Sequence, residues 1–356
     1  MKTALQLRDL VFAAAPWNGT AKASLRLIAK GLALAAAAMA TVLAIVVLVP
    51  DGNDYALATV KKHARLAAST SQKVVLVGGS NLAYGIDSRT IEHDTGCDVV
   101  NMGMNGYLGV RYMLEEVKPY LKPSDIVVVS LEYDSFYKSV DGTPSDQFMI
   151  VKANPGALDY LTAGQQLSLA GSLPYVAQQK LLRLIRSGGH AVAEAVLHKT
   201  PVRIDSIETL AGFNEYGDLT SHLGVKWQEG REDGMNLSAL PMEAELIRLL
   251  GNFGDEMRSR GVGVIVSYTP VVREFYNRHK AAIENLHRIL TQTPPLIVPR
   301  PPGGFVFDEP QFFDTVYHLN GEGRGPRTQN LVADLQRYLQ SRYQQPVCRQ
   351  TARRGS

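Results

Sequence analysis

The chain has 356 residues, of which 45% are hydrophobic and 20% are charged, and its formal net charge at pH 7 is +3. This length and composition are ample for a well-formed core in one large domain or two small ones. Much of the positive excess lies at the two ends, and no basic strip with interleaved aromatic residues occurs, so we do not expect nucleic-acid binding.

The cysteines and histidines show no spacing typical of a metal site, and we expect neither a metal nor another cofactor. Cys97 and Cys348 are the only cysteines and form no C-x-x-C pair. The histidines show no H-E-x-x-H pattern. A disulfide would require an oxidising compartment, and we do not favour one on the sequence alone.

An uncharged segment near the N-terminus predicts a membrane anchor. Residues 31–50 read GLALAAAAMATVLAIVVLVP, and at ~1.5 Å per residue such a helix is about 30 Å long, which spans a bilayer core. The preceding segment 1–30 is basic, while Asp51 and Asp54 follow the apolar run. This asymmetry predicts an N-terminus in the cytoplasm and the remainder of the chain outside it. A cleaved signal peptide is the alternative, but its apolar core is usually only ~7–15 residues long.

Strands and helices alternate along the part that follows a helical-looking linker at 51–71. Continuous apolar strands are predicted at 73–78, 98–101, 126–131, 262–268 and 295–299. Helices are predicted at 86–93, 109–121, 241–260 and 271–291, and a last one is predicted to start near Pro326. Continuous apolar strands suit a parallel sheet that is covered on both faces. We therefore predict an α/β domain with a doubly wound, mostly parallel sheet.

The alternating pattern is interrupted between about 140 and 235. That segment has polar loops, a basic amphipathic helix around 177–187 and no convincing strand, so we interpret it as an insertion or cap. The α/β domain is then expected in two parts, 72–139 and 236–345. A polar tail follows at 346–356.

Three polar segments lie where a doubly wound sheet collects its chemistry, at the C-terminal ends of strands. They are GGSN (78–81) after the first strand, NMGMNG (101–106) after the second, and DTVYHLN (314–320) before the last helix. Each segment has an ordinary explanation when taken alone. For example, Gly-Gly-Ser after a strand often forms a turn with a serine N-cap. Their combination predicts a site.

The residue types in these segments are those of nucleophilic catalysis. A serine hydroxyl needs an imidazole to take its proton and an acid to orient that imidazole. Ser80, His318 and Asp314 are the candidates for these three roles. The backbone N–H groups of Ser80 and Gly106 are candidate donors to an oxyanion, and Asn105 is a further neutral donor.

These segments resemble the sequence blocks of the SGNH (GDSL-like) hydrolase superfamily. GGSN is similar to the first block, which carries the nucleophile, and NMGMNG to the second, whose last glycine supplies an oxyanion donor. DTVYHLNGEG is similar to the last block, which carries the base and its acid. The resemblance covers about 73–135 and 260–340, and it implies an SGNH, flavodoxin-like sheet.

A membrane anchor joined to such a domain is similar to the bacterial alginate O-acetylation and teichoic-acid D-alanylation proteins. In that group the domain works with a membrane-bound O-acyltransferase and attaches an acyl group to a sugar or polyol hydroxyl. The resemblance implies an O-acyltransferase, acting with acetyl groups on an exopolysaccharide or cell-envelope glycan. It also implies a single-pass protein of the bacterial inner membrane with its catalytic domain in the periplasm. The alternatives are an acetyl esterase with the same triad and an inactive scaffold subunit.

Three positions depart from the family pattern. Gly79 stands where the family usually has an aspartate. Glu132, in SLEYDSFY, stands near the usual third-block asparagine and would oppose an oxyanion unless it is protonated or turned away. Asp314 and His318 are four apart rather than three, so a Ser80–His318 dyad is an alternative to a triad.

Four residues near the predicted site are candidates for substrate binding, namely Asn81, Tyr107, Glu132 and Tyr133. The tyrosines could stack on sugar rings, although aromatic residues beside strands are more often core. Glu132 and Asp134 could form a carboxylate pair for glycoside hydrolysis. We favour a role for Glu132 in orienting a loop or binding sugar hydroxyls.

Overall fold

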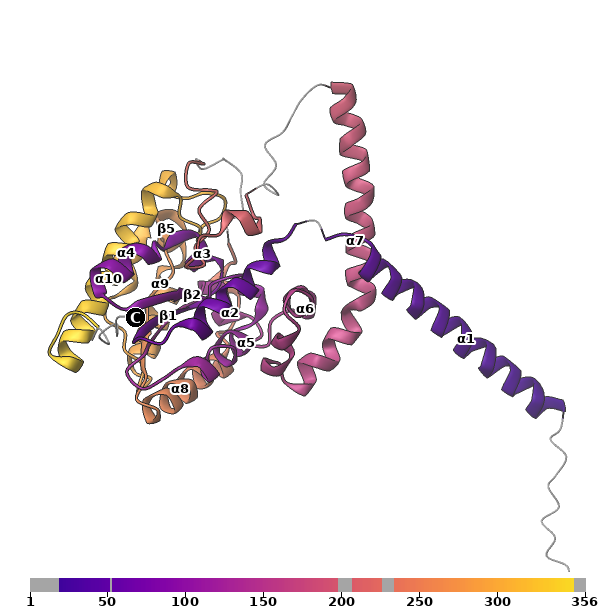
Figure 1. Ribbon diagram of the computed structural model, residues 1–356, viewed down its shortest axis with the longest axis horizontal. Coiled ribbons are helices and arrows are strands. Elements are labelled where there is room, and N and C mark those ends of the chain that lie inside the picture. Colours follow the sequence, from indigo (N-terminus) through magenta and orange to yellow (C-terminus); the bar gives the residue numbers. More distant parts are fainter. Residues whose placement is uncertain (1–18, 52, 198–206, 226–233, 349–356) are drawn as a thin grey trace, which may run out of the picture.

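The computed structural model describes residues 19–51, 53–197, 207–225 and 234–348, and its first element is a long apolar helix. Helix α1 (Gly19–Leu48) extends away from the rest of the chain (Figure 1). It is long and apolar enough to cross a membrane, with a mean hydropathy of 2.5 over its most apolar window. The prediction of an N-terminal helix long and apolar enough to span a membrane is confirmed, although the helix begins earlier than residue 31. Residues 1–18 of the basic segment lie outside the described part.

Four parallel strands form the central sheet, in the order β2-β1-β3-β4. The strands are β1 (Lys73–Gly78), β2 (Asp98–Asn101), β3 (Ile126–Ser130) and β4 (Gly263–Val266). Val75 of β1 lies opposite Val100 of β2 on one side and Val127 of β3 on the other. The prediction of a parallel α/β sheet is confirmed. The fifth predicted strand contributes only one isolated bridge, between Ile297 and Ile265.

Helices connect the strands, with boundaries that differ from the predicted ones. They are α3 (Ser80–Gly85), α4 (Ser88–Thr95), α5 (Val110–Glu115), α8 (Ala244–Ser259), α9 (Arg273–Thr291) and α10 (Gly321–Tyr343). Helix α10 begins before Pro326 because the side chain of Asn320 accepts the N–H groups of Glu322 and Gly323. Residues 271–272, predicted as helix, form the short strand β5 (Val271–Val272), which pairs in parallel with β6 (Val306–Phe307).

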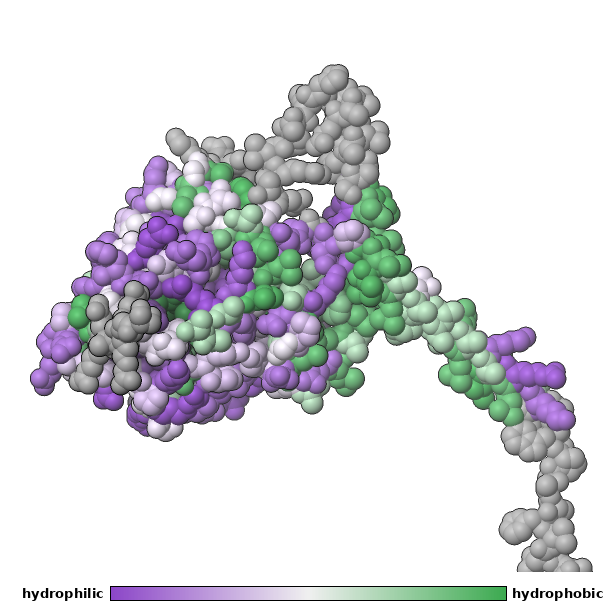
Figure 2. Space-filling model, viewed as in Figure 1, coloured by the Kyte–Doolittle hydropathy of each residue, from purple (hydrophilic) through white to green (hydrophobic). Residues whose placement is uncertain are grey.

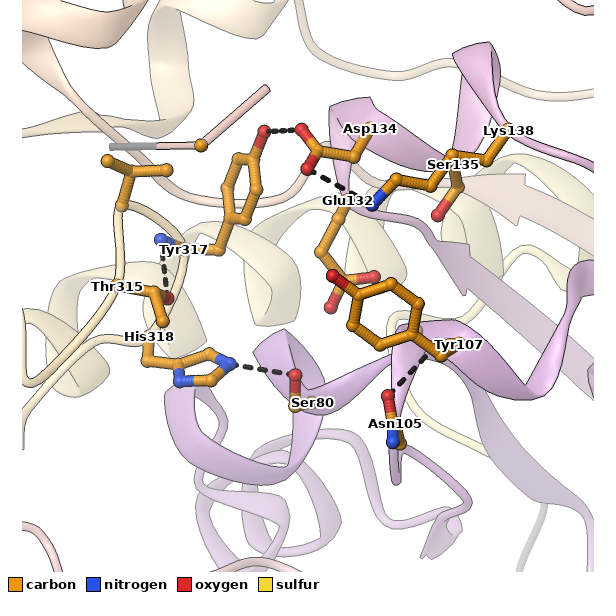
Figure 3. A pocket seen from close by; sticks show the side chains of 13 residues that line it. Ser80, Asn105, Tyr107, Glu132, Asp134, Ser135, Lys138, Thr315, Tyr317 and His318 are labelled. Atoms are coloured by element: carbon orange, nitrogen blue, oxygen red, sulfur yellow. Dashed lines mark hydrogen bonds and ion pairs between the residues drawn. The ribbon is translucent and has the colours of Figure 1, made fainter. Parts of the chain in front are cut away.

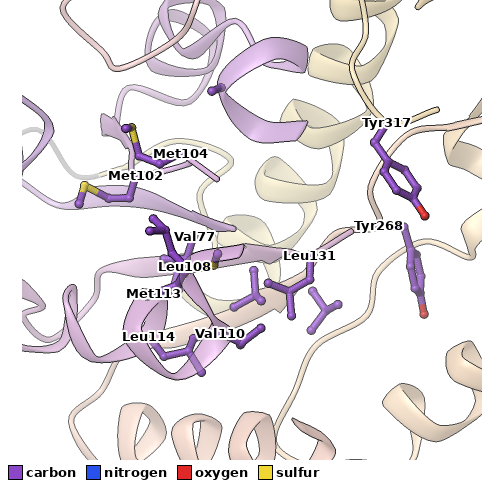
Figure 4. Packing of buried hydrophobic residues seen from close by; sticks show 14 of the residues in the cluster. Val77, Met102, Met104, Leu108, Val110, Met113, Leu114, Leu131, Tyr268 and Tyr317 are labelled. Carbon is purple, nitrogen blue, oxygen red and sulfur yellow. The ribbon is translucent and has the colours of Figure 1, made fainter. Parts of the chain in front are cut away.

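Helices cover both faces of the central sheet, because side chains alternate in direction along each strand. Val75, Val77 and Val127 point to the face covered by α2, α5 and α8, part of which Figure 4 shows. Val74 and Val128 point to the opposite face, which α4 and α10 cover. This double coverage explains why the strand sequences are apolar at every position rather than at alternate ones.

Helix α2 (Ala58–Ala68) occupies most of the segment 51–71 that we interpreted as a linker. It packs into the core on one face of the sheet. Lys62 Nζ donates hydrogen bonds to the carbonyl oxygens of Asn101 and Gly103, at 2.8 and 2.7 Å. The segment that follows the anchor is therefore tied to the glycine-rich turn after β2.

The segment 140–235 holds α6 (Pro144–Ala153) and α7 (Ala163–Leu197), and its described residues form no strand apart from one isolated bridge. Helix α7 packs against the last turns of α1 through Val46, Val176 and Ala177. Figure 2 shows that the apolar surface of α7 adjoins that of α1. The basic helix predicted around 177–187 is thus one part of a longer helix that contacts the anchor.

The C-terminal end of α1 is held by a buried lysine. Lys180 Nζ donates to the carbonyl oxygens of Val46 and Val49, both at 2.7 Å, and forms an ion pair with Asp51 at 2.7 Å. Lys152 of α6 pairs with the same carboxylate at 2.6 Å. These contacts satisfy carbonyl groups that have no partner within a helix at its C-terminal end.

Cys97 and Cys348 form a disulfide, which corrects our sequence interpretation. Helix α10 runs beside α4, and the chain beyond it turns back so that the Cys348 N–H bonds to the Thr95 carbonyl oxygen at 2.8 Å. Both cysteines are buried. Of the predicted polar tail, Cys348 therefore belongs to the core, Pro346 and Val347 are exposed, and residues 349–356 lie outside the described part.

Candidate active site

Ser80 is the first residue of α3, directly after β1 and the N-cap residue Gly79. A Cβ atom at Gly78 would overlap the carbonyl oxygen of Ser130, so the glycine lets β1 end close against β3. The N–H of Ser80 has no acceptor within the helix, because the first N–H groups of a helix lack intrahelical partners. The Gly-Gly-Ser turn thus leaves both a hydroxyl and an N–H at the end of the strand.

His318 and Asp314 lie in the turn that precedes α10. His318 Nε2 is 2.7 Å from Ser80 Oγ, and His318 Nδ1 is 2.7 Å from Asp314 Oδ1. The turn is closed by the Phe313 N–H, which donates to the His318 carbonyl oxygen at 2.8 Å. The spacing of four residues therefore still directs Asp314 to the imidazole, and the three groups form one hydrogen-bonded chain.

The environment of His318 adjusts its basicity. Burial of the ring lowers its pKa, but the charge of Asp314 and its hydrogen bond oppose this effect. With further support from the charges of Glu132 and Glu208, the pKa of His318 is raised above its ordinary value of 6.5. The ring also stacks on Tyr84, with centroids 4.1 Å apart, and the Tyr84 hydroxyl donates to the Glu208 carboxylate.

Two pockets meet at Ser80 and His318. The inner pocket is also lined by Gly106, Glu132, Asp134, Lys138 and Tyr317, and Figure 3 shows Tyr317 and His318 on one side and Tyr107 on the other. The anchor-side pocket is also lined by Asn53, Tyr55, Asp146, Arg183 and Glu208. Both pockets share Ser80, Asn105, Tyr107, Thr315 and His318. A group bound at Ser80 is therefore open to two sides.

The glycine-rich turn after β2 reaches this site as predicted from its position. Gly106 begins a short 3-10 helix, Gly106–Leu108, so its N–H also lacks an intrahelical acceptor. The side chain of Asn105 accepts the Tyr107 N–H at 2.9 Å and donates to Asp146 at 2.8 Å. Asn105 thus holds the turn, while Tyr107, 49% exposed, lies open on the pocket wall.

Two predicted substrate-binding residues do not line either pocket. Asn81 is fully buried, and its side chain bonds to Ser130, Glu132 and Arg327. Tyr133 is 1% exposed and packs near Tyr268 in the core. Neither side chain is positioned to contact a substrate.

Four residues around the site were not predicted as functional, namely Lys138, Arg183, Glu208 and Tyr317. Tyr317 donates to Asp134 at 2.6 Å, and Lys138 pairs with the same carboxylate at 3.5 Å, so Asp134 is engaged by two side chains. Glu208 and Arg183 come from the interrupted segment 140–235, where no sequence motif marked them. Only the tertiary fold brings them to the site.

The arrangement can support nucleophilic attack by Ser80, with His318 as the base and backbone N–H groups near the developing charge. Among the described residues, no group of three or more His, Cys, Asp or Glu side chains is arranged to hold a metal ion. No family model matches the chain, and no curated protein matches it either.

Proposed function

We propose that the chain is a membrane-anchored O-acyltransferase of the SGNH type, which transfers an acetyl group to a hydroxyl of an exopolysaccharide or cell-envelope glycan. The observation that carries this proposal is the hydrogen-bonded chain from Ser80 through His318 to Asp314, which opens into two pockets. The sheet order β2-β1-β3-β4 with helices on both faces supports a doubly wound SGNH domain.

In the first half of the proposed reaction, Ser80 Oγ attacks the carbonyl carbon of an acyl donor while His318 Nε2 takes the hydroxyl proton. The N–H groups of Ser80 and Gly106 stabilise the negative charge on the carbonyl oxygen. They act against the carboxylate of Glu132, whose Oε2 lies close to Gly106. The bond between the carbonyl carbon and the donor oxygen then breaks, and that oxygen takes the proton from His318. The products are an acyl ester on Ser80 and the free donor alcohol.

In the second half, an acceptor hydroxyl attacks the ester carbonyl and His318 takes its proton. Breakage of the ester bond returns this proton to Ser80 Oγ. Two pockets that meet at the nucleophile favour transfer over hydrolysis, because donor and acceptor need separate routes to one carbonyl carbon. The anchor-side pocket, bordered by Asn53 and Tyr55, is the proposed donor side.

The same proposal assigns the domain to the periplasmic side of a bacterial inner membrane, with a membrane-bound O-acyltransferase as its partner. Helix α1 supports the membrane assignment. The Cys97–Cys348 disulfide supports an oxidising compartment, since cytosolic thiols are usually kept reduced. The partner would deliver the acyl group from the membrane, next to the anchor-side pocket.

The test is to incubate the full-length protein in detergent with 4-nitrophenyl acetate and locate the adduct by peptide mass spectrometry. We expect one acetyl group on Ser80, none in Ser80→Ala, and an unchanged adduct in Ser259→Ala, a surface serine. A folded protein without an adduct on Ser80 would contradict the enzymatic proposal. Free acetate as the sole product, with and without a methyl glycoside acceptor, would instead support an esterase.

A further inference from the structure

Glu132 is held in the site by one of its two carboxylate oxygens. Glu132 is 7% exposed. Its Oε1 accepts the Asn81 backbone N–H at 3.0 Å and the Asn81 side-chain amide at 2.9 Å. A Cβ atom at Gly79 would overlap both carboxylate oxygens, so Glu132 occupies the space that a side chain at position 79 would take. Only a glycine at position 79 therefore leaves room for the Glu132 carboxylate, which follows the end of β3.

A buried cation lies on the other side of Asn81. Arg327 of α10 is 1% exposed, and it donates to the Asn81 backbone carbonyl oxygen at 2.5 Å and to its side-chain oxygen at 2.6 Å. Burial lowers the pKa of Arg327 to about 9, and the charge of Glu132 acts against that shift. Asn81 thus connects a guanidinium to a carboxylate, and this arrangement offsets part of the cost of burying Glu132.

The second oxygen of Glu132 has no such partner. Oε2 is buried and forms no hydrogen bond within the described part of the chain. It lies 3.1 Å from the position of a Cβ atom at Gly106, and Glu132 lines the inner pocket with Ser80 and His318. A buried acceptor without a donor is costly, so its retention next to a pocket indicates that a ligand supplies the donor.

From this geometry we infer that Glu132 Oε2 accepts a hydrogen bond from a hydroxyl group of the sugar or polyol acceptor in the inner pocket. The inference rests on the proposed acyl transfer and identifies the acceptor side of the site. A carboxylate oxygen only accepts hydrogen bonds, so the group it binds must be a donor. On the same pocket wall Tyr107 is half exposed, and the Lys138 ammonium lies over its ring, 4.6 Å from the centroid.

The test measures binding without catalysis, in full-length Ser80→Ala protein titrated with methyl glucoside and followed by NMR. Adding Glu132→Gln should weaken binding by about tenfold, the effect of one hydrogen bond to a charged group. The glutamine can still accept from Asn81 through its amide oxygen, so the variant keeps these hydrogen bonds, removes the charge of Glu132 and replaces the second oxygen by a donor. The control is Glu116→Gln, which alters a buried carboxylate that pairs with His63, and it should leave the affinity unchanged.

Equal or tighter binding in Glu132→Gln would overturn the inference, and so would a lack of binding in the Ser80→Ala protein that keeps Glu132.

A second measurement needs no variant of Glu132. In wild-type protein, methyl glucoside should protect Glu132 from carbodiimide coupling while coupling at Glu116 is unchanged, and equal coupling at Glu132 would contradict us. Acetylation of Ser80 reports separately on the proposed function, so the two failures are distinguishable.

Discussion

At the residue scale, the site depends on how Asp314 controls His318. The carboxylate is 2.7 Å from Nδ1, which leaves Nε2 to face Ser80. His318 can accept the serine proton only when it is neutral, so its pKa sets the lower pH limit of the proposed acylation.

We predict that Asp314→Asn moves this limit to lower pH. Asp314 raises the pKa of His318 by its charge and hydrogen bond, whereas burial lowers it, so loss of the charge lowers the pKa. The wild-type acylation rate should fall as the pH drops through a midpoint above 6.5. The variant should show a lower midpoint and a plateau reduced by on the order of a hundredfold or more.

The measurement is the rate of 4-nitrophenol release as a function of pH. Asp255→Asn, an exposed residue of α8, serves as the control and should keep the wild-type profile. Identical midpoints in wild type and Asp314→Asn would show that Asp314 does not set the basicity of His318.

Residue types and chain order were sufficient to predict the Ser80, His318 and Gly106 positions. Ser80 and Gly106 follow two adjacent parallel strands, and such strand ends meet at one edge of a sheet. The sequence could not predict that the Glu132 carboxylate fills the space beside Gly79, because this contact depends on how closely β3 approaches β1. Asn81 and Tyr133 were misassigned because they lie in the first turns of short helices that follow β1 and β3. Proximity to Ser80 or Glu132 in the sequence does not decide which side chain of such a turn faces the pocket.

At the element scale, α7 connects the interrupted segment to both the anchor and the site. Its Lys180 holds the end of α1, and its Arg183, a few residues further along, lines the anchor-side pocket. The sequence showed a basic amphipathic stretch there but did not indicate its partner. Val46 and Ala177 make this contact. Apolar residues suit a lipid-facing and a protein-facing surface equally, so the sequence could not indicate which of the two they face.

We predict that Lys180→Ala weakens the attachment of α1 to α7. The substitution removes the donor to the Val46 and Val49 carbonyl oxygens. Asp51 then loses one of its two lysine partners and keeps Lys152. Unfolding in detergent should become easier by about 1–3 kcal/mol. Amide exchange in the last turn of α1 should also accelerate. Lys61→Ala, at an exposed position of α2, is the control, and equal exchange in both variants would contradict the prediction.

At the scale of the whole molecule, the disulfide links two cysteines that are 251 residues apart in sequence. A cross-link over so long a segment reduces the conformational freedom of the unfolded chain. Because Cys97 precedes β2 and Cys348 follows α10, the bond encloses β3, β4 and the His318 turn. Sequence spacing alone could not reveal it, since cysteines this distant meet only through the path of α10.

We predict that the Cys97→Ala/Cys348→Ala double variant is less stable than wild type by roughly 2–5 kcal/mol. The measurement is denaturant unfolding followed by circular dichroism, with and without reductant. Reductant should lower the wild-type midpoint to that of the variant and leave the variant unchanged. An unaltered wild-type midpoint, once mass spectrometry has shown free thiols, would refute the stabilising role.

The enclosed stretch also has a consequence for resistance to damage. A protease that cuts once between Cys97 and Cys348 releases no fragment, because the two pieces remain covalently joined through sulfur. When the cut falls before His318, the piece that carries Ser80 stays joined to the piece that carries His318. The disulfide would thus keep the hydroxyl and the imidazole of the candidate site in one covalent molecule after a single cut.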